Sequence, residues 1–486
     1  MCKEVCEKNY TVSVIGAGVI GSMIARELCR YGIKVCILEK SSDVAGGASR
    51  ANSGIVHGGY DPEPGTLKAE LNAIGVEKLF NTAYELNVPI KRNGSLVCAF
   101  GKEEEEHLDI LLERGKINGI EGLEILSGDE VRKIEPLLSE RITAALLVKN
   151  AGIVCPYELT VAAAGNAMDN GAALYTEFEV ISITKNDDRY TVTSKDGRSV
   201  CSEYVINCAG CGSDKIASMV GDSSFKIICR AGEYMLLDKK EGSRVSHTIF
   251  QVPTSEGKGI LVSPTVDGNL LTGPTALKVD SAGSTDTTSS GLDIVKKLSL
   301  KSVPSVDFRA VITSFTGVRS SEAGGDFIIG ESEFAKNFIN VAAIDSPGLT
   351  CSVAIAERVC DILSNLGLSL TLDPEFNGHR ADPHFFKKMT DEEKDAFIKS
   401  NPAYGRIVCR CETVTEGEIR YAITHNPPAS DLDGVKRRTR SGMGRCQGGF
   451  CSPYVMSLIA KERGIPKEQV TKKGEGSEIV MGRLYK

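Results

Sequence analysis

Residues 11–21 read TVSVIGAGVIG, an apolar run that leads directly into three glycines with the spacing G-x-G-x-x-G. The apolar run predicts a buried strand, and the apolar spacing from Val19 to Tyr31 predicts a helix. A second apolar run, 33–38, ends at the acidic residue Glu39. A strand, a glycine turn, a helix and a second strand closed by an acid form the layout of a dinucleotide-binding βαβ unit.

Each glycine of this unit has its own physical reason. Gly16 permits the tight turn, Gly18 lets the backbone approach a pyrophosphate, and Gly21 allows the helix to pack closely on the strand. The phosphates then lie at the helix N-terminus, where free N–H groups favour anions. We expect Glu39 to accept hydrogen bonds from both ribose hydroxyls, so a 2′-phosphate is disfavoured. A glycine turn without a ligand is the less favoured alternative.

Later segments decide between FAD and NAD as the dinucleotide. Residues 204–210 have the pattern of a strand that ends in the small-residue turn Ala209-Gly210, and the predicted strand 337–344 runs through Ser346-Pro347-Gly348 into a helix. Cofactor-domain segments that return after long insertions favour FAD. Between them, segments such as 230–237 and 259–264 look like strands bounded by Gly and Pro, so we expect an inserted antiparallel sheet.

Four cysteines stand in two short pairs near the C-terminus, Cys409 with Cys411 and Cys446 with Cys451. Thiolates favour an iron–sulfur cluster or zinc over magnesium or calcium, because polarizable sulfur matches thiophilic metals. Zinc and a cluster both take four thiolates, so the spacing alone leaves the two open. A redox flavin in the same chain favours [2Fe–2S], with zinc or a degenerate site as alternatives.

Length and charge limit the function classes. A chain of 486 residues is expected to form two or three domains, and a net charge of −7 argues against a nucleic-acid-binding protein. The basic run 436–440 beside the cysteines is open to three interpretations: it offsets an anionic cluster, it docks an acidic partner, or it is a solvated face.

The compartment is predicted from what the chain lacks. The first residues carry no apolar signal-peptide core, and no stretch approaches the ~20 apolar residues of a membrane span. Outside the C-terminal pairs the cysteines show no disulfide framework, which is typical of a reducing compartment. We expect a cytoplasmic protein without a transmembrane segment, whose membrane association, if any, is peripheral and through a partner.

Taken together, the glycine motif with Glu39, the stretch 46–57 and the turn 346–348 resemble the FAD-dependent oxidoreductases of the D-amino-acid oxidase superfamily. Within it, residues 57–60 and 64–69 are similar to the glycerol-3-phosphate dehydrogenase and L-2-hydroxyglutarate dehydrogenase branches. The cysteine-rich tail resembles the bacterioferritin-associated-ferredoxin-like (BFD-like) [2Fe–2S] domain of anaerobic glycerol-3-phosphate dehydrogenases of the large-subunit type.

The resemblance implies oxidation of a secondary alcohol beside a phosphate or carboxylate, with hydride passing to the flavin and electrons leaving through the cluster to an acceptor protein or quinone-linked subunit. His57 is the expected base, since imidazole titrates near neutrality. Arg319 and Lys258 are expected to bind the anion. A flavin and iron–sulfur subunit without its own substrate is the alternative from another class. The expected FAD contacts are Gly16, Gly18, Gly21, Glu39, Ser49, Asn52, Ser53, Ala209, Gly210, Ser346, Gly348 and Leu349.

One departure from the resembled family concerns the substrate. Many relatives carry proline directly after the arginine that corresponds to Arg319, whereas Ser320 and Ser321 follow it here. Glycerol 3-phosphate and L-2-hydroxyglutarate therefore both remain candidates at this point.

The predicted fold class is α/β. It combines a Rossmann-like FAD-binding domain of the glutathione-reductase type, an inserted antiparallel-sheet substrate domain and a small helical C-terminal BFD-like domain. The expected boundaries are 10–85, 146–215 and 331–370 for the FAD-binding domain, 86–145 and 216–330 for the substrate domain, 371–404 for a linker, 405–465 for the cluster domain and 466–486 for a tail.

Overall fold

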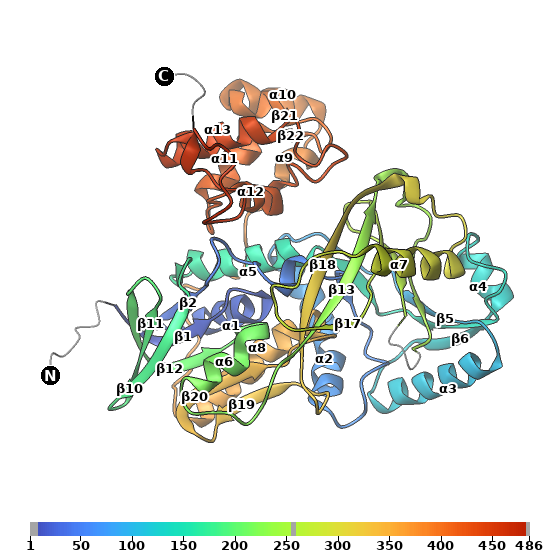
Figure 1. Ribbon diagram of the computed structural model, residues 1–486, viewed down its shortest axis with the longest axis horizontal. Coiled ribbons are helices and arrows are strands. Elements are labelled where there is room, and N and C mark those ends of the chain that lie inside the picture. The colour runs from blue at the N-terminus through green and yellow to red at the C-terminus, as the bar shows by residue number, and fades with distance from the viewer. Residues whose placement is uncertain (1–7, 254–258, 483–486) are drawn as a thin grey trace.

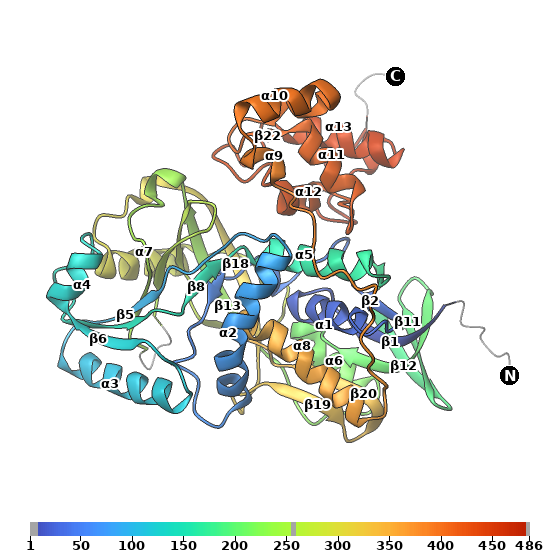
Figure 2. The same ribbon diagram turned by 180° about the vertical axis from the view of Figure 1, so that it is seen from behind.

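The computed structural model describes residues 8–253 and 259–482 and shows a body built on two large sheets, with a C-terminal helical module beside it (Figure 1). Seen from behind, the module again stands over helix α5 (Pro156–Asp169) at one side of the body (Figure 2). The two views agree that the module stands over one edge of the body.

The first sheet has eight strands and contains the predicted βαβ unit. Strand β1 pairs in parallel with β2 and β12, and β12 pairs in parallel with β20. Helices α1, α5 and α8 bury one apolar cluster against this sheet. The strands are β1 (Asn9–Ile15), β2 (Val35–Leu38), β9 (Ala173–Tyr175), β10 (Val180–Asn186), β11 (Arg189–Ser194), β12 (Ser199–Asn207), β19 (Ile328–Ser332) and β20 (Ala335–Ala342); the helices are α1 (Val19–Cys29), α6 (Ser213–Ser218) and α8 (Gly348–Asn365).

The second sheet has nine strands and matches the predicted inserted sheet, with one difference. Strand β14 pairs with β5 in parallel rather than antiparallel, because these strands come from two separate insertions and are not joined by a hairpin. The strands are β5 (Ser95–Ala99), β6 (Leu123–Ser127), β7 (Ala144–Val148), β13 (Ile228–Leu237), β14 (Thr248–Gln251), β15 (Leu261–Pro264), β16 (Leu270–Gly273), β17 (Leu277–Val279) and β18 (Val311–Ser321); the helices are α3 (Lys102–Ile117), α4 (Gly128–Ile134) and α7 (Ser289–Ser302).

A small three-stranded sheet and a long helix lie between the two large sheets. The sheet consists of β3 (Ile55–Val56), β8 (Gly152–Val154) and β4 (Ile90–Lys91), and the helix is α2 (Leu67–Glu85). The Thr66 side chain caps α2 by accepting the Ala69 N–H. The segment between β3 and α2 lies close to the N-terminus of α8, where the His57 N–H donates to Thr350.

The C-terminal module has an apolar core of its own, to which Val414, Val435 and Ile459 contribute. The segment expected to be a linker also contains helices, one of which starts with a capping box between Thr390 and Glu393. The elements are α9 (Phe385–Lys388), α10 (Asp391–Ser400), β21 (Ile407–Cys409), β22 (Val414–Thr415), α11 (Glu416–Thr424), α12 (Leu432–Thr439) and α13 (Ser452–Arg463). Across the described residues, none of the helices has the length and apolar character needed to cross a bilayer.

Candidate functional site

The glycine turn after β1 lies very close to the end of β12 and to the Ser49 loop. Gly16 has φ +106°, and a Cβ there would lie 2.5 Å from the Cys208 carbonyl oxygen. A Cβ on Gly18 would lie 3.3 Å from Ser49 Oγ. A Cβ at Gly16 would therefore collide with backbone, so only glycine fits there, whereas a Cβ at Gly18 would require the Ser49 side chain to move by a few tenths of an ångström.

Two side chains fix the backbone around this turn. Glu39 is only 7% exposed, and its two carboxylate oxygens accept the N–H groups of Ala17 and Ser41, each at 2.8 Å. Ser49 Oγ accepts the Val19 N–H at 2.9 Å at the start of α1. Each Glu39 oxygen retains a further lone pair, as a ribose contact requires.

The other expected FAD contacts lie in three nearby loops. The Asn52 side chain donates to the Ala48 and Ser49 carbonyls at 3.0 and 3.2 Å and accepts the Gly54 N–H at 2.8 Å, so it shapes the loop from within. Ser53 Oγ instead lies 3.2 Å from Tyr234 Oη on the second sheet. The loop is thereby joined to the sheet that faces it.

The loops at the ends of β12 and β20 complete this side of the site. The Ala209-Gly210 turn follows β12, and Gly210 has φ +56°, with open space where a Cβ would stand. Ser346 precedes α8, and Gly348 and Leu349 are its first two residues. Thr350 Oγ1, in the same first turn, accepts the His57 N–H at 2.8 Å. The α8 N-terminus and the His57 segment are therefore in direct contact.

His57 is held by neighbours that the sequence did not indicate. Its ring stacks on Tyr60 with centroids 4.8 Å apart, and its Nδ1 lies 3.2 Å from Oδ1 of the fully buried Asn72. Asn72 Nδ2 donates to the His57 carbonyl at 2.8 Å, so its oxygen faces the ring. The Gly59 N–H donates to Nδ1 at 3.2 Å. The two contacts suit opposite forms of the ring, because the Asn72 oxygen accepts from a protonated Nδ1 and the Gly59 N–H donates to an unprotonated one. The form that leaves the basic lone pair on Nε2 is the one that Asn72 stabilises.

The face of the second sheet carries the expected anion-binding arginine. Arg319 on β18 extends across Gly232 on β13, where a Cβ would lie 3.3 Å from a guanidinium nitrogen. Two residues further along β13, Tyr234 stacks on Phe315 with centroids 4.9 Å apart. The Tyr234 contact with the flavin-side loop shows that this face of the sheet is the one turned toward that loop. Lys258, the other expected anion ligand, lies outside the described residues.

The four cysteines come together as two pairs. Cys411 Sγ lies 3.8 Å from Cys446 Sγ, and the side chains of Cys409 and Cys451 hydrogen-bond to each other. Two thiolates on one tetrahedral metal with metal–sulfur distances of ~2.3 Å lie about 3.8 Å apart. Within residues 8–253 and 259–482, no three potential ligands converge on one ion. Two pairs suit the two irons of a [2Fe–2S] cluster better than one zinc ion.

The surroundings of these thiols favour the thiolate form at two positions. The bond with Cys451, together with backbone N–H groups including that of Gly442, lowers the pKa of Cys409 to about 5. The Phe450 N–H lowers the pKa of Cys446. N–H groups directed at sulfur also stabilise the negative charge of a bound cluster, so the donor set fits this cofactor.

The three arginines of the basic run 436–440 are buried rather than solvated, and Lys436 is half-buried. Arg437 Nη2 lies 2.6 Å from the Asp43 carboxylate, and Arg438 donates to both of its oxygens at 2.7 and 2.8 Å. Asp43 is 3% exposed and belongs to the loop between β2 and the flavin-side residues. These arginines therefore dock the module on the body, so the interpretation as a solvated face was wrong.

Arg440 makes a second junction, which reaches helix α5 and the second sheet of the body. It donates to Asp267 at 2.5 Å, to Tyr157 Oη and Asn269 Oδ1 at 3.1 Å, and to Glu412 beside the cysteines at 3.0 Å. One buried guanidinium thus joins the cysteine loop to α5 and to the turn between β15 and β16. The cysteine-bearing loop is fixed on the body through this residue.

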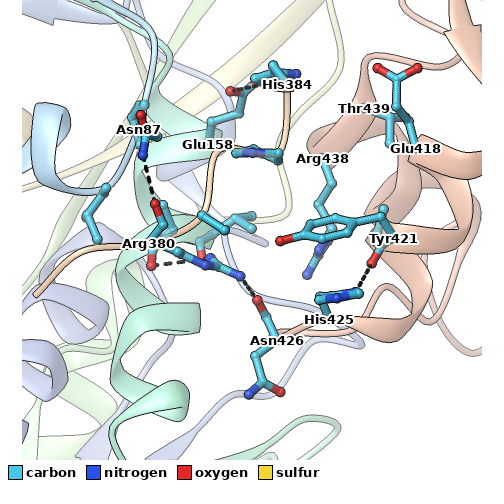
Figure 3. Close-up of a pocket in the computed structure, with 17 residues that line it drawn as sticks. Asn87, Glu158, Arg380, His384, Glu418, Tyr421, His425, Asn426, Arg438 and Thr439 are labelled. Carbon is cyan, nitrogen blue, oxygen red and sulfur yellow. Dashed lines mark hydrogen bonds and ion pairs between the residues drawn. The ribbon is translucent and has the colours of Figure 1, made fainter. Parts of the chain in front are cut away.

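A pocket lies between α5 and the module, lined by Glu158, Arg380 and Tyr421 among others (Figure 3). Arg380 donates to the Asn426 carbonyl, and His384 Nε2 lies 2.9 Å from Glu158 Oε2. Burial lowers the pKa of His384, but the interaction with Glu158 outweighs this and the net pKa is raised. The pocket is part of the junction and lies apart from His57 and Arg319.

This ion pair predicts a pH-dependent junction. Because the folded pKa of His384 is raised, its stabilising contribution is complete below the unfolded pKa of about 6.5 and is lost as pH rises through the folded pKa. We expect the thermal midpoint of His384→Gln to fall below that of the unmodified protein at pH 6 and to converge with it toward pH 9. Calorimetric scans across this range measure the difference, and a constant gap would contradict the assignment.

Comparison with known proteins places both parts of the chain. Residues 11–362 match the model of the FAD dependent oxidoreductase family, and residues 407–461 match the BFD-like [2Fe-2S] binding domain. The chain belongs to the FAD dependent oxidoreductase family. It is an FAD-dependent oxidoreductase that carries a C-terminal [2Fe–2S] domain, which confirms the predicted fold class and both predicted cofactors.

Three relatives describe the range of similarity. A glycerol 3-phosphate dehydrogenase of Caloramator mitchellensis is 45% identical over 97% of this chain and 98% of its own length. A glycerol 3-phosphate oxidase of Mycoplasma genitalium is 34% identical over 76% of this chain and 99% of its own. The structure of L-alpha-glycerophosphate oxidase from Mycoplasma pneumoniae with FAD bound superposes with a TM-score of 0.74 at 33% identity, covering 77% and 98% of the two chains.

Proposed function

We propose that this enzyme oxidises sn-glycerol 3-phosphate to dihydroxyacetone phosphate and that the electrons leave through its own [2Fe–2S] domain to an acceptor. The observation that carries the proposal is the 45% identity with a glycerol 3-phosphate dehydrogenase, because that similarity extends through both the flavin body and the C-terminal module. The oxidases, which match 76% of the chain, share the body.

The side chains divide the work on the substrate as follows. His57 Nε2 accepts the proton of the secondary hydroxyl, while Asn72 accepts the Nδ1 hydrogen and so holds the ring in the required tautomer. Arg319 binds the phosphate with its planar fork, and Lys258 adds a second positive charge. Bound FAD would supply a two-electron acceptor for the hydride of the carbinol carbon, and a cluster on the four cysteines would supply a one-electron centre.

The remaining residues of the site are assigned to the two cofactors. We assign Glu39 to the ribose, the glycine turn and Ser49 to the pyrophosphate region, and the loops around Asn52, Ala209 and Ser346 to the rest of FAD. Cys409, Cys411, Cys446 and Cys451 hold the cluster. The N-terminus of α8, directed toward the His57 segment, stabilises negative charge that develops on the flavin side of the site.

L-2-Hydroxyglutarate oxidation is the rival with specific support. A mitochondrial L-2-hydroxyglutarate dehydrogenase of Pongo abelii is 28% identical over 73% of this chain. A carboxylate suits Arg319 as well as a phosphate does. The lower identity, and a match that covers less of this chain, support this substrate less than glycerol 3-phosphate.

Anaerobic stopped-flow absorbance separates these functions. The cluster-reconstituted holoenzyme is mixed with glycerol 3-phosphate or with L-2-hydroxyglutarate, and the flavin band is followed. Bleaching by the first substrate alone is the expected result, and bleaching by the second alone supports the rival. If neither substrate bleaches a flavin that dithionite reduces, both assignments fail, and a subunit without its own substrate, or a different substrate, takes their place.

The role of Asn72 is testable by opposite shifts in a pH profile. Asn72→Leu removes the acceptor for Nδ1–H, so we expect flavin reduction to slow about tenfold and its apparent pKa to fall. Asn72→Asp places a carboxylate beside the ring, so the apparent pKa is expected to rise. Rates measured from pH 5 to 9 for both variants check this. A merely structural role would leave the pKa of flavin reduction unchanged.

A further inference from the structure

Two further cationic side chains lie beside Arg319 on the second sheet. Arg230 on β13 is directly opposite Arg319 on β18, and on its other side it is directly opposite Lys278 on β17. Residues directly opposite each other in an antiparallel pair point to the same face, with Cβ atoms about 4.5–5.5 Å apart. The three side chains therefore form a row across three adjacent strands (Figure 1). We call Arg319, Arg230 and Lys278 the cationic row.

The face that carries the cationic row is the one turned toward the flavin-side loops. The row shares this face with Ser321 on β18 and Tyr234 on β13, because alternate side chains of a strand point to the same side. Ser321 Oγ donates to Asp345 Oδ2 at 2.9 Å, in the loop that leads to α8. Tyr234 Oη lies 3.2 Å from Ser53 Oγ. Along the strands the row lies between these two contacts, on the side of the sheet where substrate is expected to bind.

The charges of the cationic row are not neutralised by the protein. Within residues 8–253 and 259–482, the side chains of Arg230, Arg319 and Lys278 make no ion pair or hydrogen bond. Asp345, which contacts the same face, is already paired with Lys68 Nζ at 2.6 Å. Like charges directly opposite each other destabilise a sheet. An anion bound between the two arginines would remove this cost, so the arrangement indicates an anion site.

Exposure increases along the row from the flavin side outward. Arg319 is half-buried, whereas Arg230 and Lys278 are exposed. Strand β18 is the one in contact with the flavin-side loops, since the Ala51 carbonyl oxygen lies against Gly317, where no Cβ would fit. A line of like charges that leads into a site raises the local concentration of ligands of opposite charge and their association rate. The row therefore offers anions a path from solvent to Arg319.

We propose that Arg230 acts with Arg319 to bind the phosphoryl group of the substrate and that Lys278 is the outer end of the path by which this anion enters. The inference rests on the proposed function and deepens it, because it assigns a residue that selects a phosphoryl group over a carboxylate. A phosphoryl group carries nearly two negative charges at neutral pH, and two planar guanidinium groups match its oxygens. Either carboxylate of L-2-hydroxyglutarate offers the same pair only one charge.

Binding of simple anions to the oxidised holoenzyme tests the site without turnover. Inorganic phosphate and acetate are titrated at pH 8 and constant ionic strength, and the flavin difference spectrum is followed. We expect Arg230→Gln to weaken phosphate binding about ten- to a hundredfold, the range for a lost hydrogen bond to a charged group. Acetate binding should weaken less than about threefold, because Arg319 alone suits one carboxylate. Arg230→Lys should fall between, since it keeps the charge but loses the planar fork.

Single-turnover reduction by glycerol 3-phosphate tests the same residues with substrate. Arg230→Gln is expected to raise the substrate concentration that gives half the maximal rate by about ten- to a hundredfold. The rate at saturation should stay nearly unchanged, because the phosphoryl group is held equally before and during the reaction. Lys278→Gln should weaken the salt dependence of the rate at low substrate, since one steering charge is lost. Arg463→Gln, at an exposed arginine of α13 in the C-terminal module, is the matched control and should change none of these constants.

Several results would overturn the proposal. No phosphate binding to the unmodified holoenzyme, unchanged phosphate affinity in Arg230→Gln, or an equal loss in Arg463→Gln would each exclude Arg230 as a phosphoryl ligand. Equal weakening of phosphate and acetate binding would show a general charge effect without selection. The thermal midpoint of Arg230→Gln without added anion should equal or exceed that of the unmodified holoenzyme, because one of two opposed like charges is gone. A lower midpoint would contradict the repulsion on which the site is argued.

The two sets of measurements separate this inference from the proposed function. If phosphate binds through Arg230 but glycerol 3-phosphate does not bleach the flavin, the anion site stands and the proposed function fails. If glycerol 3-phosphate bleaches the flavin and Arg230→Gln binds phosphate normally, the proposed function stands and only the role of Arg230 fails.

Discussion

Replacing His57 by alanine is expected to slow flavin reduction by glycerol 3-phosphate by about 10²- to 10⁴-fold, the range for loss of a general base. The Asn72 contact at 3.2 Å and the Tyr60 stack hold the imidazole in one orientation. Substrate affinity should change little, because Arg319 is intact. Single-turnover stopped-flow at saturating substrate measures the effect.

Two controls make the His57 result specific. His379→Ala removes an exposed histidine of the segment that leads to the module and should leave the rate unchanged. Added imidazole should restore part of the rate of His57→Ala, because the cavity admits a free base in place of the side chain. A rate within threefold of the unmodified enzyme, with FAD fully bound, would contradict the assignment of His57 as base.

The βαβ unit could be predicted from the sequence because its signals are local. The strand, the glycines at fixed spacing and Glu39 all fall within one short segment, and the observed β1, α1 and β2 differ from the expected elements only at their ends. The two cysteine pairs that are close in sequence are local signals of the same kind. The spatial pairing of Cys411 with Cys446 and of Cys409 with Cys451 could not be predicted, because each of these contacts joins two loops that meet only in the folded module.

Asn72 could not be predicted, because its role depends on where helix α2 packs. Its helix bears a buried face that reads as ordinary core, and nothing in a sequence distinguishes an amide that holds a histidine from one that fills space. For the basic run 436–440, the residues themselves could be recognised in the sequence but their partner could not. Asp43, the partner that explains their burial, lies nearly four hundred residues earlier in the chain.

Asp43→Ala is expected to release the C-terminal module from the body. Removal of one partner of a buried ion pair typically destabilises by 3–5 kcal/mol, because the other charge stays buried and uncompensated. Here two guanidinium groups, with side chains only 7 and 6% exposed, would lose their shared carboxylate. Differential scanning calorimetry should show the module unfolding or separating earlier, and limited proteolysis should cut within 371–404 faster than in the unmodified protein.

The pKa of Asp43 sets the pH range over which this junction holds. Burial raises the pKa, but Arg438 and then Arg437 outweigh burial, and the net pKa is lowered. The stabilisation is therefore complete above the unfolded pKa of about 3.9 and is lost only as pH falls through the folded value. Protease resistance of the junction in the unmodified protein should persist across neutral and mildly acidic pH, whereas Asp43→Ala should be sensitive throughout.

An exposed ion pair provides the matched control for Asp43. Glu124→Ala breaks a contact with Lys149 at 3.0 Å in which both side chains are more than half exposed, so a loss below about 1 kcal/mol is expected. If Asp43→Ala behaves like this control in calorimetry and proteolysis, the docking does not depend on the buried carboxylate. If the module is released while glycerol 3-phosphate still bleaches the flavin, substrate oxidation belongs to the body, and the buried arginines serve to keep the cysteine-bearing module in place beside it.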